Sequence, residues 1–242
     1  MKALILNSGM GSRMGDETKM HPKCMTQIQQ NETILSRQLK QIVKLGITSV
    51  VITTGYFDTI LVEYCQSLGL PLEYIFVKNE KYDSTNYIYS IYMAKDALMN
   101  EDILMMHGDL VFDDTCMELS LESEESCMVV DSTLELPEKD FKAVVEENRI
   151  KAVGIDFFEN AYSAQPLYKL NANTWQIWLD EIIAYCENGE TSCYAENAFN
   201  AVSDMCKIVP LDIKGLFCTE IDTPEDWNVV RKRLEGNDSA VG

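Results

Sequence analysis

The sequence predicts an α/β protein with a doubly wound, mostly parallel sheet and a small antiparallel or lid insertion. Three observations favour this class. The chain opens on an unbroken apolar run over residues 2–6, which is typical of a strand buried on both faces in the middle of a parallel sheet. Strand-like and helix-like patterns then alternate at regular spacing as far as residue 107. Beyond residue 114 the strand-like pieces are short and separated by turns, which indicates antiparallel additions.

The first half of the chain has the alternating pattern. Apolar residues recur at helical spacing after Thr33, and Gly46 stands where a helix C-terminus favours a left-handed residue. Asp58 is suited to cap the next helix, which Gly69 would end. The expected strands lie at 2–6, 47–54, 72–77 and 103–107, and the expected helices at about 33–45, 58–68 and 86–98. A ligand is expected at the C-terminal ends of these parallel strands.

The second half has a different organisation but no confident boundary between independent domains. We therefore expect one domain over 1–235, with an acceptor-side insertion at about 131–205, and a tail or linker at 236–242. A last helix should open at Thr223-Pro224, with proline in its first turn. The other expected elements are short strands at 126–130, 141–146, 150–153, 167–170 and 208–211 and helices at 174–187 and 195–205.

Composition narrows the possible partners. The chain of 242 residues carries a formal charge of −19 and 46% apolar residues, so it can build a core but repels nucleic acid and anionic membranes. No apolar run approaches the roughly 18 residues of a membrane helix, and because the first residues follow a strand pattern we expect no secretory signal. The eight cysteines are scattered without a C-x-x-C pair and predict reduced thiols. We therefore expect a cytoplasmic protein.

A glycine-rich loop follows the first strand. Glycines at this place let the backbone approach a phosphate and point its N–H groups at the ligand. The loop runs from Leu6 through Gly9, Gly11 and Arg13, and Lys23 follows it. It is neither a dinucleotide fingerprint, which would need glycine at Met14, nor a P-loop. A tight turn between strand and helix is the simpler alternative, and the nearby Arg and Lys favour phosphate binding.

In these residues the chain resembles the nucleotidyltransferases that share a G-x-G-x-R…P-K loop. The resemblance implies a Rossmann-like nucleotidyltransferase fold in which the loop wraps a nucleoside triphosphate and Arg13 and Lys23 neutralise its phosphates. It also implies that two aspartates hold Mg2+, and Asp109 and Asp222 match those acidic positions. From the residues alone, Asp109 could instead cap a turn and Asp222 could cap the last helix.

Within that superfamily the chain is most similar to the small cytidylyltransferases, and among them to the 2-aminoethylphosphonate cytidylyltransferase family. The stretches 81–90, 194–197 and 220–222 carry this resemblance. It implies transfer of CMP from CTP to 2-aminoethylphosphonate, which gives CMP-2-aminoethylphosphonate and pyrophosphate for the decoration of phosphonate lipids or glycans. It also implies an aminotransferase partner, either C-terminal or separate. Phosphocholine or a sugar 1-phosphate is the alternative acceptor, and a non-catalytic nucleotide-binding module is a further alternative.

The expected site residues fall into four groups. A phosphonate oxygen is already ionised, so attack on the α-phosphorus needs charge neutralisation and alignment more than a base. A primary ammonium donates three hydrogen bonds and favours carboxylates, whereas a quaternary one favours aromatic faces. The expected catalytic residues are Lys23 and Arg13; the nucleotide-binding residues are Leu6, Asn7, Ser8, Gly9, Met10, Gly11, Ser12, Arg13, Lys23, Gly55, Ser84, Thr85 and Asn86; the acceptor-binding residues are Asp131, Tyr168, Tyr194 and Glu196; and the metal ligands are Asp109 and Asp222.

Overall fold

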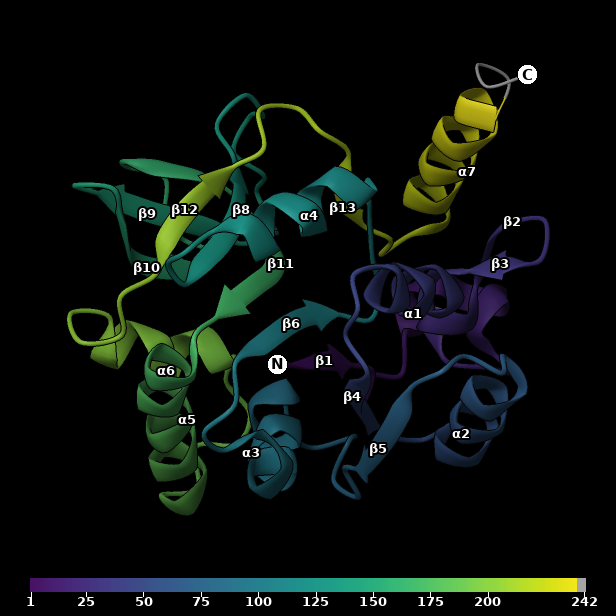
Figure 1. Ribbon diagram of the computed structural model, residues 1–242, viewed down its shortest axis with the longest axis horizontal. Coiled ribbons are helices and arrows are strands. Elements are labelled where there is room, and N and C mark those ends of the chain that lie inside the picture. Colours follow the sequence, from purple (N-terminus) through teal and green to yellow (C-terminus); the bar gives the residue numbers. More distant parts are fainter. Residues whose placement is uncertain (239–242) are drawn as a thin grey trace.

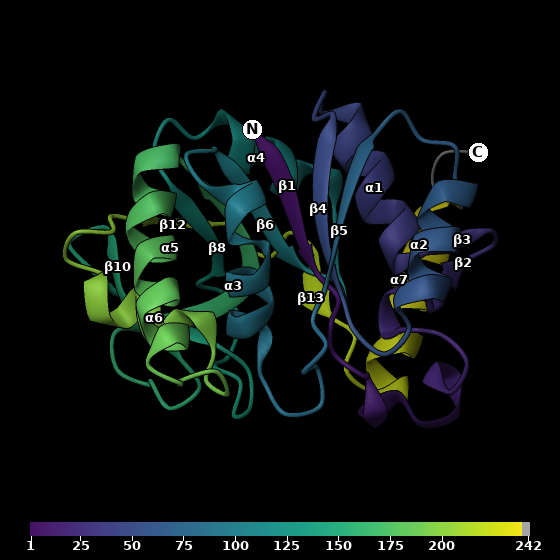
Figure 2. The same ribbon diagram turned by 90° about the horizontal axis from the view of Figure 1, so that it is seen from below.

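A central sheet with helices on both faces organises the molecule (Figures 1 and 2). The computed structural model describes residues 1–238, with only the backbone of Ser12, 237 and 238. The parallel part of the sheet consists of β6 (Ile103–His107), β1 (Lys2–Leu6), β4 (Ser49–Thr54) and β5 (Glu73–Lys78), side by side in that order. The predicted fold class is confirmed, with the first strand in the middle of the sheet.

Each parallel strand supplies both faces of the core. Leu4 and Leu6 of β1 face one apolar cluster, and Ala3 and Ile5 face another. Because successive strand residues point to opposite faces, an unbroken apolar run is what a strand covered on both sides requires. The first cluster includes α3 (Tyr87–Leu98) and α5 (Ala172–Glu187), whereas the second includes α1 (Ile34–Lys44), α2 (Asp58–Ser67) and α4 (Asp114–Glu122).

The insertion extends the same sheet. Strand β11 (Ala161–Leu170) pairs antiparallel with β6, with Leu167 opposite Met106. It also pairs with β9 (Lys142–Glu146) and β8 (Cys127–Asp131). The remaining strands are β10 (Arg149–Gly154), which pairs with β9, and β12 (Val209–Asp212), which pairs with β8. Helix α6 (Ala195–Val202) belongs to the same half of the molecule. This half is therefore a continuation of the sheet beyond β6, packed by α5 and α6 on one face.

Several short elements have no signal in the sequence pattern. They are η1 (Ser12–Thr18), η2 (Lys23–Met25), the pair β2 (Gln27–Gln29) and β3 (Glu32–Thr33), and the pair β7 (Leu110–Phe112) and β13 (Cys218–Glu220). Two or three residues cannot show a period, and β7 and β13 pair only through the tertiary fold.

Some helix ends differ from the expected ones. Asp58 is the first residue of α2 and accepts a hydrogen bond from Thr54, while the N-cap position is Phe57. Helix α7 (Pro224–Asp238) begins at the predicted proline and covers the first three residues of the expected tail. Residues 239–242 of that tail lie outside the described part of the chain. No helix within residues 1–238 is long and apolar enough to cross a membrane.

Gly108 allows a close approach of two strand ends. Its backbone N–H donates to the carbonyl of Leu6 at 3.0 Å, and a Cβ at this position would overlap the side-chain carbonyl oxygen of Asn7. Only glycine fits at this junction of β1 and β6. The junction matters because Asp109 is the next residue.

We expect Gly108→Ala to lower the free energy of unfolding by about 1–3 kcal/mol, because the added methyl group overpacks a closed site. Urea denaturation followed by circular dichroism measures this change. Gly236→Ala, where a Cβ meets open space on α7, is the control and should cause no loss. In an Asn7→Ala background the cost of Gly108→Ala should fall, and an unchanged cost would contradict the assigned overlap.

Candidate active site

The glycine-rich loop leaves β1 and forms one wall of a cavity. Gly11 has a φ of 63°, in the left-handed region, and its carbonyl accepts hydrogen bonds from Met14 N at 3.1 Å and Thr18 Oγ1 at 2.9 Å. These bonds start η1 and turn the chain back over the strand ends. A cavity of about 280 Å3, called the loop cavity, is lined by Leu6, Asn7, Gly9, Gly11, Arg13, Pro22, Lys23, Cys24, Gly108 and Asp109.

Lys23 joins the two predicted metal ligands. Its Nζ lies 2.5 Å from Asp109 Oδ2 and 2.7 Å from Asp222 Oδ1. Arg13 Nη2 lies 2.9 Å from the same oxygen of Asp222. Burial alone would lower the pKa of Lys23, but the two carboxylates outweigh burial and raise it. The structure therefore brings residues 13, 23, 109 and 222 into one charged cluster.

The backbone holds this cluster in register. Strands β7 and β13 pair antiparallel, and Ile221 N donates to the carbonyl of Asp109 at 3.0 Å. Asp226 Oδ2 accepts from the backbone N–H groups of Asp222 and Thr223 at 3.1 and 2.8 Å. Thr223 Oγ1 in turn accepts from Asp226 N at 3.3 Å, so Thr223 and Asp226 together cap the start of α7. This leaves the Asp222 carboxylate for Lys23 and Arg13.

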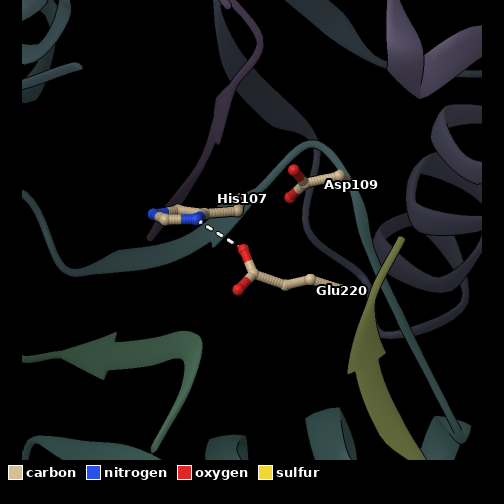
Figure 3. A group of neighbouring side chains, drawn as sticks. All are labelled: His107, Asp109 and Glu220. Carbon is tan, nitrogen blue, oxygen red and sulfur yellow. Dashed lines mark hydrogen bonds and ion pairs between the residues drawn. The ribbon is translucent and has the colours of Figure 1, made fainter. Parts of the chain in front are cut away.

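His107 and Glu220 form a second pair beside the cluster (Figure 3). His107 Nδ1 lies 2.9 Å from Glu220 Oε1, and ligand atoms of His107, Asp109 and Glu220 lie within 4.8 Å of one another. Burial opposes the charged imidazole, but the hydrogen bond and charge of Glu220 outweigh it and raise the pKa of His107 to about 9. Burial and the Asp109 charge raise the pKa of Glu220 to about 7. Burial also opposes the Asp109 charge, but Lys23 and His107 outweigh it and lower the pKa of Asp109.

A second cavity lies on the other side of the first strand end. This Ser8 cavity, of about 180 Å3, is lined by Leu6, Ser8, Gly9, Tyr82, Thr85, Asn86, Tyr87, His107 and Asp109. Asn79 is buried and donates from Nδ2 to Thr85 Oγ1 and Ser90 Oγ, each at 3.0 Å, while Ser8 and Ser90 hydroxyls are 2.7 Å apart. This network connects the start of α3 to the loop. Gly55 lies against the Ser8 carbonyl, where a Cβ would clash.

Two further cavities open toward the insertion. The Glu220 cavity, of about 260 Å3, is lined by Arg13, Asn86, Tyr87, His107, Asp109, Lys139, Asp140, Phe141, Ile155, Tyr194, Glu220 and Asp222. The Asp156 cavity, of about 360 Å3, is lined by Phe141, Val153, Gly154, Ile155, Asp156, Phe157, Cys193, Tyr194, Glu196, Asn197 and Asn200. Phe141, Ile155 and Tyr194 belong to both, so the two cavities are neighbours. A larger groove of about 1070 Å3, beside β2, β3, α2 and α7, shares no lining residue with any of these four cavities.

The predicted acceptor-binding residues occupy three different situations. Tyr194 is 38% exposed and lies at the boundary of the Glu220 and Asp156 cavities. Glu196 is buried and accepts hydrogen bonds from Tyr168 at 2.8 Å and from Tyr87. Tyr168 is buried behind it. Asp131 is not brought to this group, because its carboxylate accepts from Thr133 and from Gly215 N at the end of β8.

The predicted nucleotide-binding residues lie mostly on these cavities. Seven of them line the loop or Ser8 cavities, besides Arg13 and Lys23: Leu6, Asn7, Ser8, Gly9, Gly11, Thr85 and Asn86. Met10 is 48% exposed on the loop, Ser84 is exposed at the turn before α3, and Ser12 begins η1.

Sequence reasoning missed seven residues that line the Glu220 cavity, namely Tyr87, His107, Lys139, Asp140, Phe141, Ile155 and Glu220. His107 forms a hydrogen bond with Glu220 and also lines two cavities. A polar residue at the end of an apolar strand, beside Gly108-Asp109, is the signal that could have identified it. Lys139 and Phe141 lie in a loop without a pattern, so no sequence signal was available for them.

From the His107–Glu220 pair we predict that the stability of the fold depends on pH. The folded protein binds the His107 proton more tightly than the unfolded chain, so this stabilisation is full below pH 6.5 and is lost as the pH rises to about 9. We expect His107→Gln to flatten the profile of melting temperature against pH between 6.5 and 9, measured with EDTA present. Wild-type and variant profiles with the same slope in that window would contradict this assignment.

Comparison with solved structures identifies the fold. The structure of CTP:phosphocholine cytidylyltransferase from Streptococcus pneumoniae superposes with a TM-score of 0.75 at 18% identity and covers 96% of this chain and 98% of that one. The fold is therefore the Rossmann-like nucleotidyltransferase fold, a mixed α/β architecture with a mostly parallel sheet.

Comparison with known families is more specific. Residues 3–135 match the MobA-like NTP transferase domain, and because this is more than half of the chain, the chain belongs to that family. CTP:phosphoglutamine cytidylyltransferase of Campylobacter jejuni is 30% identical over 135 residues, which are 54% of this chain and 52% of the relative. The 2-aminoethylphosphonate cytidylyltransferase of Lancefieldella rimae is 27% identical over 112 residues, 46% of this chain and 44% of the relative. The chain thus spans about half the length of the curated relatives it matches.

Proposed function

We propose that the protein transfers CMP from CTP to 2-aminoethylphosphonate and releases pyrophosphate. The observation that carries this proposal is the cluster of Lys23, Arg13, Asp109 and Asp222, which lies between the loop cavity and the Glu220 cavity. Two separate ligands could meet at such a cluster, one from each cavity. The names of the related cytidylyltransferases support CTP as the nucleotide.

The proposed mechanism assigns a task to each part of the chain. Loop N–H groups and Arg13 bind the β and γ phosphates, and Lys23 neutralises charge at the α phosphate. The Ser8 cavity holds the nucleoside, so that the α-phosphorus faces the Glu220 cavity. The acceptor binds in the Glu220 cavity, where its ionised oxygen attacks in line and pyrophosphate leaves toward the loop. This chain need not supply a general base.

Asp109 and Asp222 fit a divalent cation. Asp109 Oδ1 is buried and has no hydrogen-bond partner, although its other oxygen contacts Lys23. Carboxylate oxygens are the ligands that Mg2+ favours, so these two residues would hold it, with the ion partly neutralising phosphate charge when bound.

Chelation with EDTA should then abolish pyrophosphate release, and added Mg2+ should restore it.

The choice of acceptor rests on the neighbouring cavities. An acceptor whose phosphonate lies in the Glu220 cavity can extend its ammonium past Tyr194 into the Asp156 cavity, which Asp156 and Glu196 line. Carboxylates suit a primary ammonium because it donates hydrogen bonds. The Lancefieldella relative, named for 2-aminoethylphosphonate, supports the same acceptor.

Phosphocholine is the second candidate acceptor. The rings of Tyr87 and Phe141 flank Tyr194, with centroids 5.8 and 5.0 Å from it. An aromatic wall of this kind suits a quaternary ammonium. The solved cytidylyltransferase of similar fold is named for phosphocholine, and this supports testing phosphocholine as an acceptor.

Pyrophosphate release tests the proposal directly. The purified chain receives Mg2+ and either CTP or UTP, with 2-aminoethylphosphonate, phosphocholine, phosphoglutamine or a sugar 1-phosphate as acceptor. The highest kcat/KM is expected with CTP and 2-aminoethylphosphonate. A higher kcat/KM for another acceptor would assign that acceptor as the substrate instead. No pyrophosphate release with any of the four acceptors would contradict transferase activity.

Lys23→Ala and Asp109→Asn should each reduce turnover by at least about 100-fold, because the first removes the cation assigned to the α phosphate and the second removes the charge of a proposed Mg2+ ligand. The assay is pyrophosphate release at saturating CTP. Lys40→Ala, which removes the ion pair between Lys40 of α1 and Glu32 of β3, is the matched control and should retain activity. If either site variant, folded by circular dichroism, kept near wild-type turnover, its proposed role would be wrong.

A further inference from the structure

One basic residue of the Glu220 cavity has no carboxylate partner. The cavity carries two permanent cations, Arg13 and Lys139. Arg13 is paired with Asp222 at 2.9 Å. Among the side chains that the structure describes, Lys139 makes no ion pair; this exposed residue lines the cavity.

The backbone beside Lys139 is held from several sides. Lys142 Nζ donates to the carbonyl of Asp140 at 3.0 Å, and this buried lysine also lies 4.4 Å from the ring centroid of Phe158. Ala164 N donates to the carbonyl of Phe141 at 3.0 Å, and the ring of Phe141 packs against Tyr194. Hydrogen bonds therefore hold the backbone next to Lys139, while the N–H groups of the Lys139 ammonium are available to a ligand.

The charge around the cavity explains why a free cation matters there. Four carboxylates line it, namely Asp109, Asp140, Glu220 and Asp222. Burial and, after it, the charges of Asp222 and Asp226 raise the pKa of Asp140. An anionic acceptor entering the cavity would be repelled unless a cation were available that is not already engaged by a carboxylate.

We propose that Lys139 binds the phosphonate, or the phosphate, of the acceptor and holds it beside the cluster of Lys23 and Asp222. This assignment rests on the proposed function and adds a cation from the insertion to its site. Lys139 supplies charge-assisted hydrogen bonds to the acceptor oxygens that do not attack. It leaves the nucleotide to Lys23, Arg13 and the loop.

The test compares Lys139→Met with Lys139→Arg and with Lys207→Met, which removes an exposed lysine outside the four cavities. Pyrophosphate release is measured with acceptor varied at saturating CTP and with CTP varied at saturating acceptor. Lys139→Met should raise the acceptor KM about 10- to 100-fold for 2-aminoethylphosphonate and for phosphocholine alike, with the CTP KM changed less than about twofold. Lys139→Arg should recover most of the loss, and Lys207→Met should behave as wild type.

The outcomes separate this inference from the proposed function. Wild-type turnover with an unchanged acceptor KM in Lys139→Met would overturn the Lys139 assignment alone. Phosphoglutamine, which carries an additional carboxylate, is assayed in parallel. If Lys139→Met raised the acceptor KM for phosphoglutamine alone, the assignment would also be overturned, because Lys139 would then bind a different anion. If wild type shows no turnover, the proposed function fails, and calorimetric titration of 2-aminoethylphosphonate with CTP and Mg2+ present decides the inference: loss of binding in Lys139→Met supports it, and equal binding or no binding to wild type overturns it.

Discussion

The site depends on one ammonium group held between two carboxylates. Lys23 Nζ contacts Asp109 and Asp222, which lie 86 and 199 positions away in the sequence. Two carboxylates at roughly 5 Å repel each other by about 3 kcal/mol at an effective dielectric constant of 20, so the intervening cation offsets a substantial cost. Three segments of the chain, from η2, the turn after β6 and the start of α7, are joined at this point.

The same pairing links the binding of the two kinds of ligand that the proposed function requires. A triphosphate that attracts Lys23 and Arg13 leaves Asp109 and Asp222 without their cations. Each of these carboxylate side chains is only 19% exposed, so losing its partner is costly, and a second cation becomes favourable there when the nucleotide binds. Nucleotide and divalent cation would therefore bind cooperatively under the proposed function. Without ligands, the ion pairs with Lys23 and Arg13 would offset the repulsion between the two carboxylates.

The sequence predicted the parallel half of the fold well because its signals are local. Strands such as 2–6 and 103–107 are covered on both faces and show it as unbroken apolar runs, and Gly46 and Asn86 mark the helix ends. The pairing of β11 with β6 and of β13 with β7 was not predictable, because it joins segments about 60 and 110 residues apart with no local pattern. Arg13, Lys23, Asp109 and Asp222 were located by their motifs and meet in space, whereas the Asp131 carboxylate is engaged at a different place. The His107–Glu220 pair depends on the β7–β13 contact and so could emerge only from the folded structure.

The division of the site also explains why the nucleotide is easier to assign than the acceptor. The family match over residues 3–135 contains the glycine-rich loop, Lys23, Asp109 and the whole lining of the Ser8 cavity. The acceptor side lies largely beyond it, because Lys139, Phe141, Ile155, Tyr194 and Glu220 all follow residue 135. Under the proposed function, this division would let the first half keep the nucleotide chemistry while the insertion changes the acceptor. Relatives named for phosphoglutamine and for 2-aminoethylphosphonate each match only about half of this chain. Under the proposed function, the identity of the acceptor would therefore be decided by the side chains of the insertion rather than by the family.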